Sequence, residues 1–246
     1  MKDTIIIIPS RLSATRLPNK PLLKINNKSL IMNVYERAIS SKVGDVYVAT
    51  CDKEIYQEVH SNGGNCVMTS RHHQSGTDRI FEAFQKIKLI NVRYIINLQG
   101  DEPLIGPLDI KKLAKVSKSN NFDIGTLAYK IDKLSVYKNK NIVKVTTEKP
   151  LTLKQNSYAM EFSRKVNMIK NLNIYHHIGV YCYKSSILKK FSNLKKTINE
   201  KKNKLEQLRA LDNNLKIGVL LSKSYSLGVD TKKDFLEIKK IMEYKV

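Results

Sequence analysis

A loop near the N-terminus concentrates three cations directly after an apolar run. The stretch IIIIPSRLSATRLPNKPL covers residues 5–22 and holds Arg11, Arg16 and Lys20 among prolines and small polar residues. Arginine forks match phosphate oxygens two at a time, and lysine adds a mobile point charge. The loop has no glycine and no GxxxxGK[ST] pattern, so side chains would have to bind most of a phosphate group. The sequence leaves two interpretations open, a polyphosphate site and a basic surface turn.

Two aspartates follow other strand-like segments and could bind a metal ion. Asp101 stands in NLQGDEPLI (97–105) beside Gly100, and Asp230 ends GVD (228–230). Carboxylates at the ends of strands suit Mg²⁺ that is also bound to phosphates. Two structural alternatives remain, in which Asp101 accepts from the backbone amides of a turn and Asp230 caps the last helix. Taken together, the aspartates predict one metal site shared with the basic loop.

A third polar segment, TSRHHQSGTDR (69–79), leads into a predicted helix. Ser75, Gly76 and Thr77 offer backbone amides and hydroxyls to a base or ribose, and Thr77 is a plausible helix cap. The adjacent histidines at 72–73 are not expected to bind a metal, because neighbouring side chains rarely face the same point. This segment therefore predicts contacts to a nucleoside rather than a metal site.

Strands and helices alternate through the first half of the chain. The predicted strands are residues 4–9, 45–50, 66–69 and 92–99, and the predicted helices are residues 29–40, 53–64, 76–87 and 107–119. Such alternation is typical of an α/β protein with a mostly parallel sheet and helices on both faces. Ligands bind beyond the carboxyl ends of strands in such sheets, which is where the polar motifs stand.

The second half has a different pattern. Strand-like segments at 123–131, 141–149, 156–164 and 176–184 predict a small mixed-sheet insertion, and the end returns to a helix at 202–214, a strand at 216–222 and a helix at 231–244. We expect one domain in three parts: residues 1–120 mainly bind the nucleotide, 121–190 bind the second substrate and mediate dimerisation, and 191–246 complete the α/β fold. No internal repeat is present.

The chain has 246 residues and a formal net charge of +22. Only eight of the 44 basic residues are arginine, and the lysines are spread over predicted solvated helix faces. A basic nucleic-acid-binding protein is one alternative, but the sequence lacks its usual signatures, and an anionic small-molecule substrate is favoured. Three scattered cysteines predict neither a disulfide framework nor a zinc site. No signal peptide or membrane-length apolar run is evident, which predicts a cytoplasmic protein.

Seven motifs together resemble a known family. The motifs are IIPSRLSATRLPNKPL, HQSGTDR, NLQGDEPLI, FSR, HHIGVYCY, LEQLRAL and GVDT, and they stand in the order found in 3-deoxy-manno-octulosonate (Kdo) cytidylyltransferases, also called CMP-Kdo synthetases. The similarity runs from about residue 4 to 240. It implies a nucleotide-diphospho-sugar transferase (Rossmann-like) fold and a cytoplasmic homodimer. It also implies the Mg²⁺-dependent conversion of CTP and Kdo to CMP-Kdo and diphosphate, which serves lipopolysaccharide synthesis.

The resemblance also implies roles for individual residues. The residues implied for catalysis are Arg11, Arg16, Lys20 and Asp101, with Arg11 and Lys20 on the CTP phosphates. Those implied near the cytosine and ribose are Arg71, Ser75 and Gly76. Those implied for the sugar acid are Gln99, Arg164, His177, Tyr181, Glu206 and Gln207, with Arg164 as the partner of its carboxylate. Those implied for Mg²⁺ are Asp101 and Asp230.

Several positions depart from the family pattern. Asn19 replaces a glycine, and asparagine tolerates the positive φ that such a turn requires. His72 and Glu161 replace commoner residues, and the segment after Arg164 is short and different. These changes leave open another sugar acid, such as 8-amino-Kdo or a nonulosonate.

Overall fold

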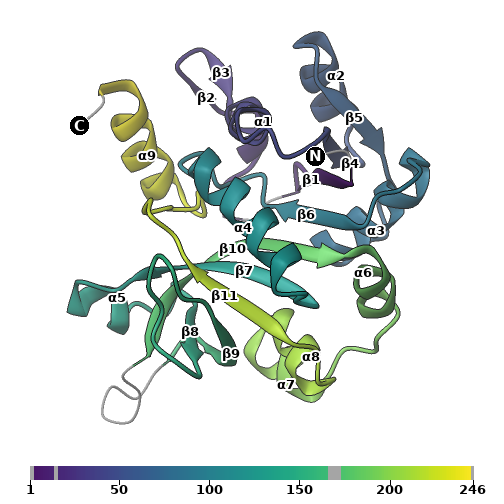
Figure 1. Ribbon diagram of the computed structural model, residues 1–246. Coiled ribbons are helices and arrows are strands. Elements are labelled where there is room, and N and C mark those ends of the chain that lie inside the picture. Colours follow the sequence, from purple (N-terminus) through teal and green to yellow (C-terminus); the bar gives the residue numbers. More distant parts are fainter. Residues whose placement is uncertain (1–2, 14–15, 166–172, 245–246) are drawn as a thin grey trace. The chain divides into compact units, whose positions relative to one another are not determined.

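The computed structural model describes residues 3–13, 16–165 and 173–244 (Figure 1). Parts of the basic loop (14–15) and of the segment after Arg164 (166–172) lie outside the described residues. The chain forms two compact units, which we call unit 1 (Met1–Lys111 with Tyr225–Val246) and unit 2 (Lys112–Ser224). The boundaries of these units differ from those of the three functional parts expected from the sequence. The roles expected for those three parts stay predictions.

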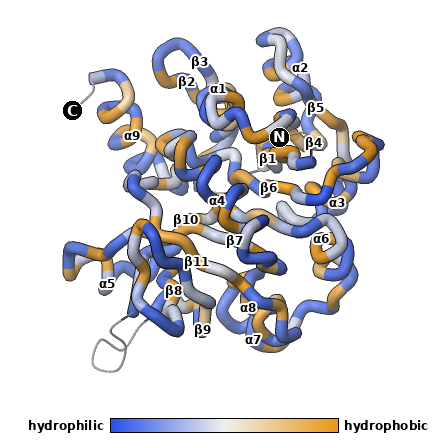
Figure 2. The backbone as a smooth tube through the Cα atoms, in the orientation of Figure 1, coloured by the Kyte–Doolittle hydropathy of each residue, from blue (hydrophilic) through white to orange (hydrophobic). Residues whose placement is uncertain are grey.

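Unit 1 contains a parallel sheet in which the isoleucine-rich strand is flanked on both sides. The strands, in the order β5–β4–β1–β6, are β5 Asn65–Met68, β4 Val46–Thr50, β1 Thr4–Ser10 and β6 Tyr94–Leu98. All seven residues of β1 are buried, which explains its near-continuous apolar sequence, coloured orange in Figure 2. All four strands predicted for this half of the chain are confirmed.

Helices cover these strands, as the alternating pattern predicted. The elements are η1 Lys20–Leu22, the hairpin β2 Lys24–Ile25 and β3 Lys28–Ser29, α1 Leu30–Ser40, α2 Lys53–Ser61, α3 Gly76–Ile87, the start of α4 Pro107–Ser119, and α9 Lys232–Tyr244. Ser29 caps α1 by accepting from the amide of Met32. The predicted cap of α3 is wrong: Ser75, not Thr77, accepts from the Asp78 amide at 3.1 Å. Thr77 already lies in the first turn and is buried.

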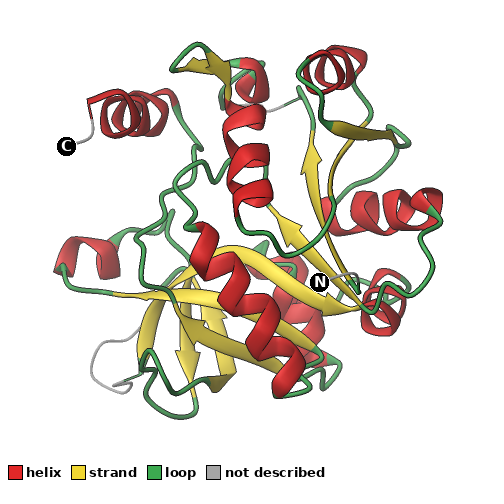
Figure 3. Ribbon diagram, turned by 45° about the horizontal axis from the view of Figure 1, so that its top comes forward, coloured by secondary structure: helices red, strands yellow, loops and turns green. Residues whose placement is uncertain are grey.

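Unit 2 contains the mixed sheet expected from the sequence. Its strands, in the order β10–β7–β11–β9–β8, are β10 Ile174–Lys184, β7 Ile124–Lys130, β11 Ile217–Leu221, β9 Ser157–Ser163 and β8 Lys144–Thr147. Strands β7 and β11 pair in parallel, and the other pairs are antiparallel. Strand β10 also pairs with β8. The α/β fold class is therefore confirmed, and Figure 3 shows its yellow strands flanked by red helices.

Four further helices complete unit 2: α5 Leu134–Lys138, α6 Ser185–Ser192, α7 Ile198–Asn203 and α8 Gln207–Asp212. The single helix predicted for 202–214 is wrong. Lys204 ends α7 in the left-handed conformation, with φ 53°, and buried Leu205 follows it before α8 begins. Within the described ranges, no helix combines the length and apolar character that a membrane crossing requires.

Candidate active site

A cavity of about 320 Å³ lies in unit 1, beside the carboxyl ends of β1 and β6. Its described lining is Pro9, Ser10, Arg11, Ser13, Arg16, Lys20, Pro21, His73, Gln74, Ser75, Gly76, Arg79, Gln99, Gly100, Asp101 and Asp230. Eight of the residues predicted for the site are in this set. Arg71 is not in it and is exposed. The strand-end location agrees with the general position of ligands in parallel α/β sheets.

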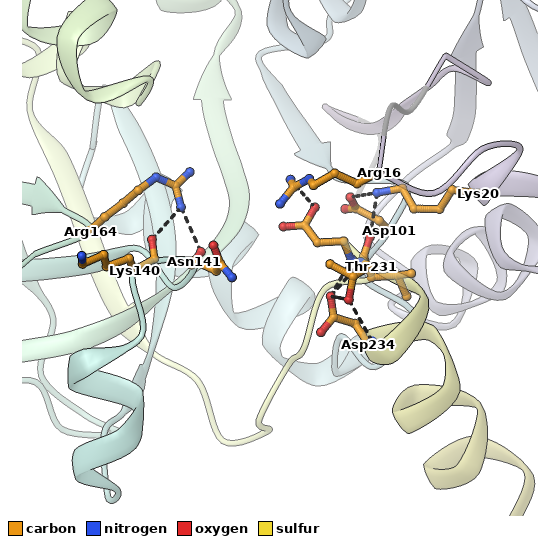
Figure 4. Close-up of polar contacts among 10 residues, drawn as sticks. Arg16, Lys20, Asp101, Lys140, Asn141, Arg164, Thr231 and Asp234 are labelled. Carbon is orange, nitrogen blue, oxygen red and sulfur yellow. Dashed lines mark hydrogen bonds and ion pairs between the residues drawn. The ribbon is translucent and has the colours of Figure 1, made fainter.

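Two ion pairs join the basic loop to the two predicted metal ligands (Figure 4). The Lys20 Nζ donates to Asp101 Oδ2 at 2.6 Å, and the Arg16 guanidinium donates to Asp230 Oδ1 at 3.0 Å. The Lys20 Nζ also donates to the carbonyl of Val229 at 2.7 Å, and the Val229 amide donates to the Asp101 carbonyl at 2.9 Å. Segments more than 80 residues apart thus meet at one charged cluster.

The turn before Lys20 has the geometry expected of its asparagine. Asn19 adopts φ 54° and ψ 21°, the left-handed conformation, immediately before the short helix η1. The Leu22 amide closes this turn by donating to the Asn19 carbonyl at 2.9 Å. Asparagine is among the few residues other than glycine that adopt this conformation readily. The prediction of a positive φ at Asn19 is confirmed.

Asp230 is not the cap of the last helix. The Asp234 amide donates to the Thr231 hydroxyl, and the Asp234 carboxylate accepts from the Thr231 amide at 2.8 Å. This reciprocal pair is a capping box at the start of α9. The Asp230 carboxylate accepts from Arg16 instead, and the Asp101 carboxylate accepts from Lys20. Both aspartate side chains are therefore held by cations that a substrate could attract away.

Glu102 adds a third carboxyl group that the sequence analysis missed. The Ser226 hydroxyl donates to its Oε2 at 2.6 Å, and a Cβ on Gly228 would come within 3.1 Å of its Oε1. Burial raises the pKa of Glu102 to about 7, the negative charges of Asp101 and Asp230 add to this rise, and the Ser226 bond opposes it. Among the described residues, no three carboxyl, imidazole or thiol groups are arranged to hold a metal ion by themselves, so Asp101 and Asp230 would need oxygen atoms of a ligand to complete a metal site.

The wall contributed by residues 69–79 contains two further side chains that the sequence analysis did not select. Arg79 is buried and donates to the Thr69 hydroxyl and the Ser70 carbonyl. His73 bonds to the Glu82 carboxylate, which also accepts from Lys86 at 2.7 Å. Burial opposes ionisation of Glu82, but bonds from Lys86, the Ser70 amide and His73 lower its pKa to about 2. The helical spacing from Ser75 to Arg79 is the signal that could have revealed this arginine.

Unit 2 brings together two of the residues implied for the sugar acid. His177 and Tyr181 lie on β10 with ring centroids 5.4 Å apart, and Phe162 packs edge-on against His177. The His177 Nε2 hydrogen-bonds to the Thr126 hydroxyl at 3.0 Å. Burial, with a further contribution from His176, lowers the pKa of His177 to about 3. The ring is therefore neutral near pH 7. Burial and the charge of Glu206 raise the pKa of Tyr181.

Arg164 stands at the end of β9, where main-chain atoms hold it. Its guanidinium donates to the carbonyls of Asn141, at 2.9 Å, and Lys140, at 3.4 Å (Figure 4). Lys144, which the sequence analysis did not select, is fully buried, and its Nζ donates to the carbonyls of Asn139 and Arg164. Burial and then the Arg164 charge lower the pKa of Lys144. The two cations are thus tied to one turn.

Glu206 and Gln207 lie at the start of α8, beside a buried ion-pair network. Arg209 donates to both carboxylate oxygens of Glu200 and, at 3.0 Å, to Glu206. Its guanidinium lies 4.6 Å from the centroid of the Phe191 ring. Gln207 is buried. This network holds the start of α8, where the LEQLR motif (residues 205–209) lies.

Comparisons with known proteins agree with this geometry. The cytidylyltransferase family model matches residues 5–217. A 3-deoxy-manno-octulosonate cytidylyltransferase from Thermodesulfovibrio yellowstonii is 44% identical, with 94% of each chain covered. Another from Afipia carboxidovorans is 40% identical, with 98% of this chain and 97% of the relative covered.

Solved structures give the same result. The structure of a CMP:2-keto-3-deoxy-manno-octonic acid synthetase complexed with CTP covers 100% of both chains, with a TM-score of 0.88 and 32% identity. A UDP-glucose pyrophosphorylase shares the fold alone, at a TM-score of 0.72 and 14% identity. The chain is a nucleotidyltransferase by these relationships, and it belongs to the family of 3-deoxy-manno-octulosonate cytidylyltransferases.

Proposed function

We propose that this protein transfers CMP from CTP to 3-deoxy-D-manno-octulosonate, releasing diphosphate and supplying activated Kdo for lipopolysaccharide synthesis. The observation that carries the proposal is the charged cluster of unit 1, where the Lys20–Asp101 and Arg16–Asp230 pairs line a strand-end cavity. A metal-bound triphosphate can exchange with both pairs. Its phosphate oxygens take the cations, and the metal takes the carboxylates.

Arg11, Arg16 and Lys20 would hold the triphosphate and stabilise negative charge on the departing diphosphate. Ser75 and Gly76 would lie beside the nucleoside. Gly76 lets the start of α3 pack closely on β1, because an added Cβ would lie 3.3 Å from the Pro9 side chain. Arg71 keeps its proposed role near the base as a prediction that needs a movement of its exposed side chain.

Asp101 and Asp230 would hold a divalent cation, and we propose that it is Mg²⁺. Two carboxylates completed by phosphate oxygens and water match the coordination that Mg²⁺ prefers. When bound, the ion would polarise the α-phosphate and favour ionisation of the attacking hydroxyl. The chain itself supplies no covalent nucleophile in this proposal, because in-line phosphoryl chemistry depends on positioning and charge neutralisation.

Gln99, Arg164, His177, Tyr181, Glu206 and Gln207 would bind the sugar acid. Arg164 would pair with its carboxylate. The neutral His177 imidazole and the protonated Tyr181 hydroxyl would offer hydrogen bonds to sugar hydroxyls, since neither side chain ionises near pH 7. The anomeric hydroxyl would then attack the α-phosphorus.

The decisive experiment measures diphosphate release from each of the four nucleoside triphosphates with Kdo, 8-amino-Kdo and a nonulosonate. We expect release with CTP and Kdo. A preference for 8-amino-Kdo or a nonulosonate would instead support the alternative substrate that the differences from the family pattern left open. No release with any sugar acid would contradict the proposal. A homodimer and a cytoplasmic location stay predictions, which sedimentation and cell fractionation would test.

A further inference from the structure

Asp52 makes an unusual contact for a residue at its position. It stands at the N-cap position of α2 with extended backbone angles, φ −104° and ψ 125°, yet its side chain makes no capping hydrogen bond. Its Oδ2 accepts instead from the Leu12 amide at 2.8 Å, across 40 residues of sequence. Aspartate is among the best helix caps, so this side chain gives up a favourable local bond for a distant one.

The distant bond fixes the basic loop just where it leaves the sheet. The pairing of β1 with β4 ends at Ser10 and Thr50. The hydrogen bond between Leu12 and Asp52 links the two segments again, two residues beyond the end of each strand. Asp52 is itself held, because its amide donates to the hydroxyl of buried Thr50 at 3.1 Å. A charged acceptor on a backbone amide makes a stronger bond than a neutral one.

The residues on either side of Leu12 line the cavity. Arg11 and Ser13 both belong to its lining, whereas Asp52 does not. A carboxylate near a triphosphate site would disfavour binding by its charge alone. Asp52 could therefore favour a triphosphate only through the backbone that it holds.

We propose that Asp52 is a positioning residue that fixes Arg11 for the triphosphate of CTP. Arg11 has many rotatable bonds, and the loop that carries it has no glycine-rich cradle. Anchoring the adjacent amide reduces the freedom that Arg11 must lose when it binds phosphate. This inference rests on the proposed function, because it takes CTP as the ligand of the cavity.

The test compares Asp52→Ser, Asp52→Asn and the matched control Glu54→Gln. Serine is a good cap but is too short to reach the Leu12 amide, whereas asparagine keeps both the length and an acceptor oxygen. Glu54 is an exposed acidic residue in the first turn of α2. The dissociation constant of CTP is measured calorimetrically without sugar acid, together with the KM values, the Tm and hydrogen exchange at the Leu12 amide.

We expect Asp52→Ser to weaken CTP binding about 10-fold and Asp52→Asn about 3-fold or less, with the Tm within about 2 °C of the wild type. The KM for the sugar acid and the control variant should not change. In Asp52→Ser, the Leu12 amide should exchange faster. Asp52→Ser combined with Arg11→Ala should bind CTP no more weakly than Arg11→Ala alone.

Unchanged CTP binding by Asp52→Ser, an additive double variant, or Asp52→Asn no better than Asp52→Ser would overturn the inference. A wild-type protein that binds no CTP would instead overturn the proposed function, and with it the ligand named here. The two failures are therefore distinguishable.

Discussion

The side chains of Lys20 in unit 1 and Lys144 in unit 2 are both largely shielded from solvent, but their hydrogen-bond acceptors differ in kind. Lys20 pairs with a carboxylate, Asp101, at 2.6 Å, and its side chain keeps 15% of its exposure at the cavity wall. Lys144 is fully buried, and both described acceptors of its Nζ are main-chain carbonyls. The first lysine lines the cavity of unit 1, and the second lies inside unit 2.

The difference distinguishes an exchangeable contact from a permanent one. An ion pair at a cavity wall can be replaced by a ligand that brings charges of both signs. Carbonyl partners belong to the chain and stay in place whatever binds. Burying a cation without a carboxylate is costly, and the position of Lys144 beside Arg164 fits the proposed role of Arg164 in binding the carboxylate of the sugar acid. Four predictions test this distinction and the residues on which it depends.

The largest effect is expected at Asp101. Asp101→Asn removes a proposed metal ligand and the partner of Lys20, so kcat/KM should fall about 1,000-fold at subsaturating Mg²⁺. The circular dichroism spectrum should not change, because the carboxylate lies at the cavity and not in the core. Asp132→Asn, at an exposed site in unit 2, is the control. Turnover near the wild-type value in Asp101→Asn would remove the metal assignment.

The buried histidines of unit 2 predict the next effect, on stability against pH. Burial lowers the pKa of His176 to about 4 and of His177 to about 3, against an ordinary value of 6.5. Between pH 6.5 and these lowered pKa values, the two histidines are therefore protonated in the unfolded chain and neutral in the folded protein. Stability should be complete above pH 6.5 and should fall as the pH drops from there towards 3, by up to about 1.4 kcal/mol per pH unit for each histidine.

Urea unfolding between pH 7 and 4 measures this slope. His177→Gln should make the slope shallower, and His60→Gln, at an exposed position of α2, should leave it unchanged. A slope that is identical in all three proteins would show that His177 does not take up a proton on unfolding in this range.

A smaller effect should follow from Lys144→Met. Removing the buried cation leaves two carbonyls without their donor and loosens the turn that holds Arg164. We expect the KM for the sugar acid to rise about 10-fold while the KM for CTP stays constant. Lys154→Met, at an exposed position of unit 2, is the control. An equal rise in both KM values would mean that Lys144 supports the whole fold and has no selective effect on the sugar-binding residues.

The smallest effect is expected at Asn19, which precedes Lys20. Asn19→Ala puts a less tolerant residue at φ 54° and should lower the free energy of unfolding by about 1 kcal/mol. Asn19→Gly should match the wild type within about 0.5 kcal/mol, because glycine adopts this conformation freely. Chemical denaturation checks both values. Equal stability of Asn19→Ala and the wild type would show that the positive φ at residue 19 does not favour asparagine over alanine.

Much of the fold could be predicted because its signals are local. Runs of β-branched residues predicted β1 and β6, and helical spacing predicted α1 and α9. The break after α7 could not be predicted, because buried Leu205 depends on packing by distant residues. The cap of α3 was misassigned because Ser75 and Thr77 are both good caps in sequence, and only the backbone decides between them.

The same limit applies to the site. Arg11, Lys20 and Asp101 are recognisable because cations and carboxylates follow strands. Glu102 and Arg79 were missed because a sequence does not show how far a charged side chain is withdrawn from water: Arg79 is buried, and Glu102 is partly buried. The positive φ of Asn19 was predicted because this residue stands where the family pattern has a glycine, and asparagine tolerates that conformation.

The paired state of the charged cluster has a consequence for selectivity. In a protein of net charge +22, a cavity lined by free cations would collect any anion, including inorganic phosphate and nucleic acid. Here an anion alone would leave Asp101 and Asp230 without their cationic partners. A divalent cation alone would leave Arg16 and Lys20 without their carboxylate partners, and Lys20 would keep only the Val229 carbonyl among its described partners. A ligand that brings both charges together would compensate both ion pairs at once. With the function proposed above, the cavity would therefore bind a polyphosphate together with a metal ion more readily than either one alone.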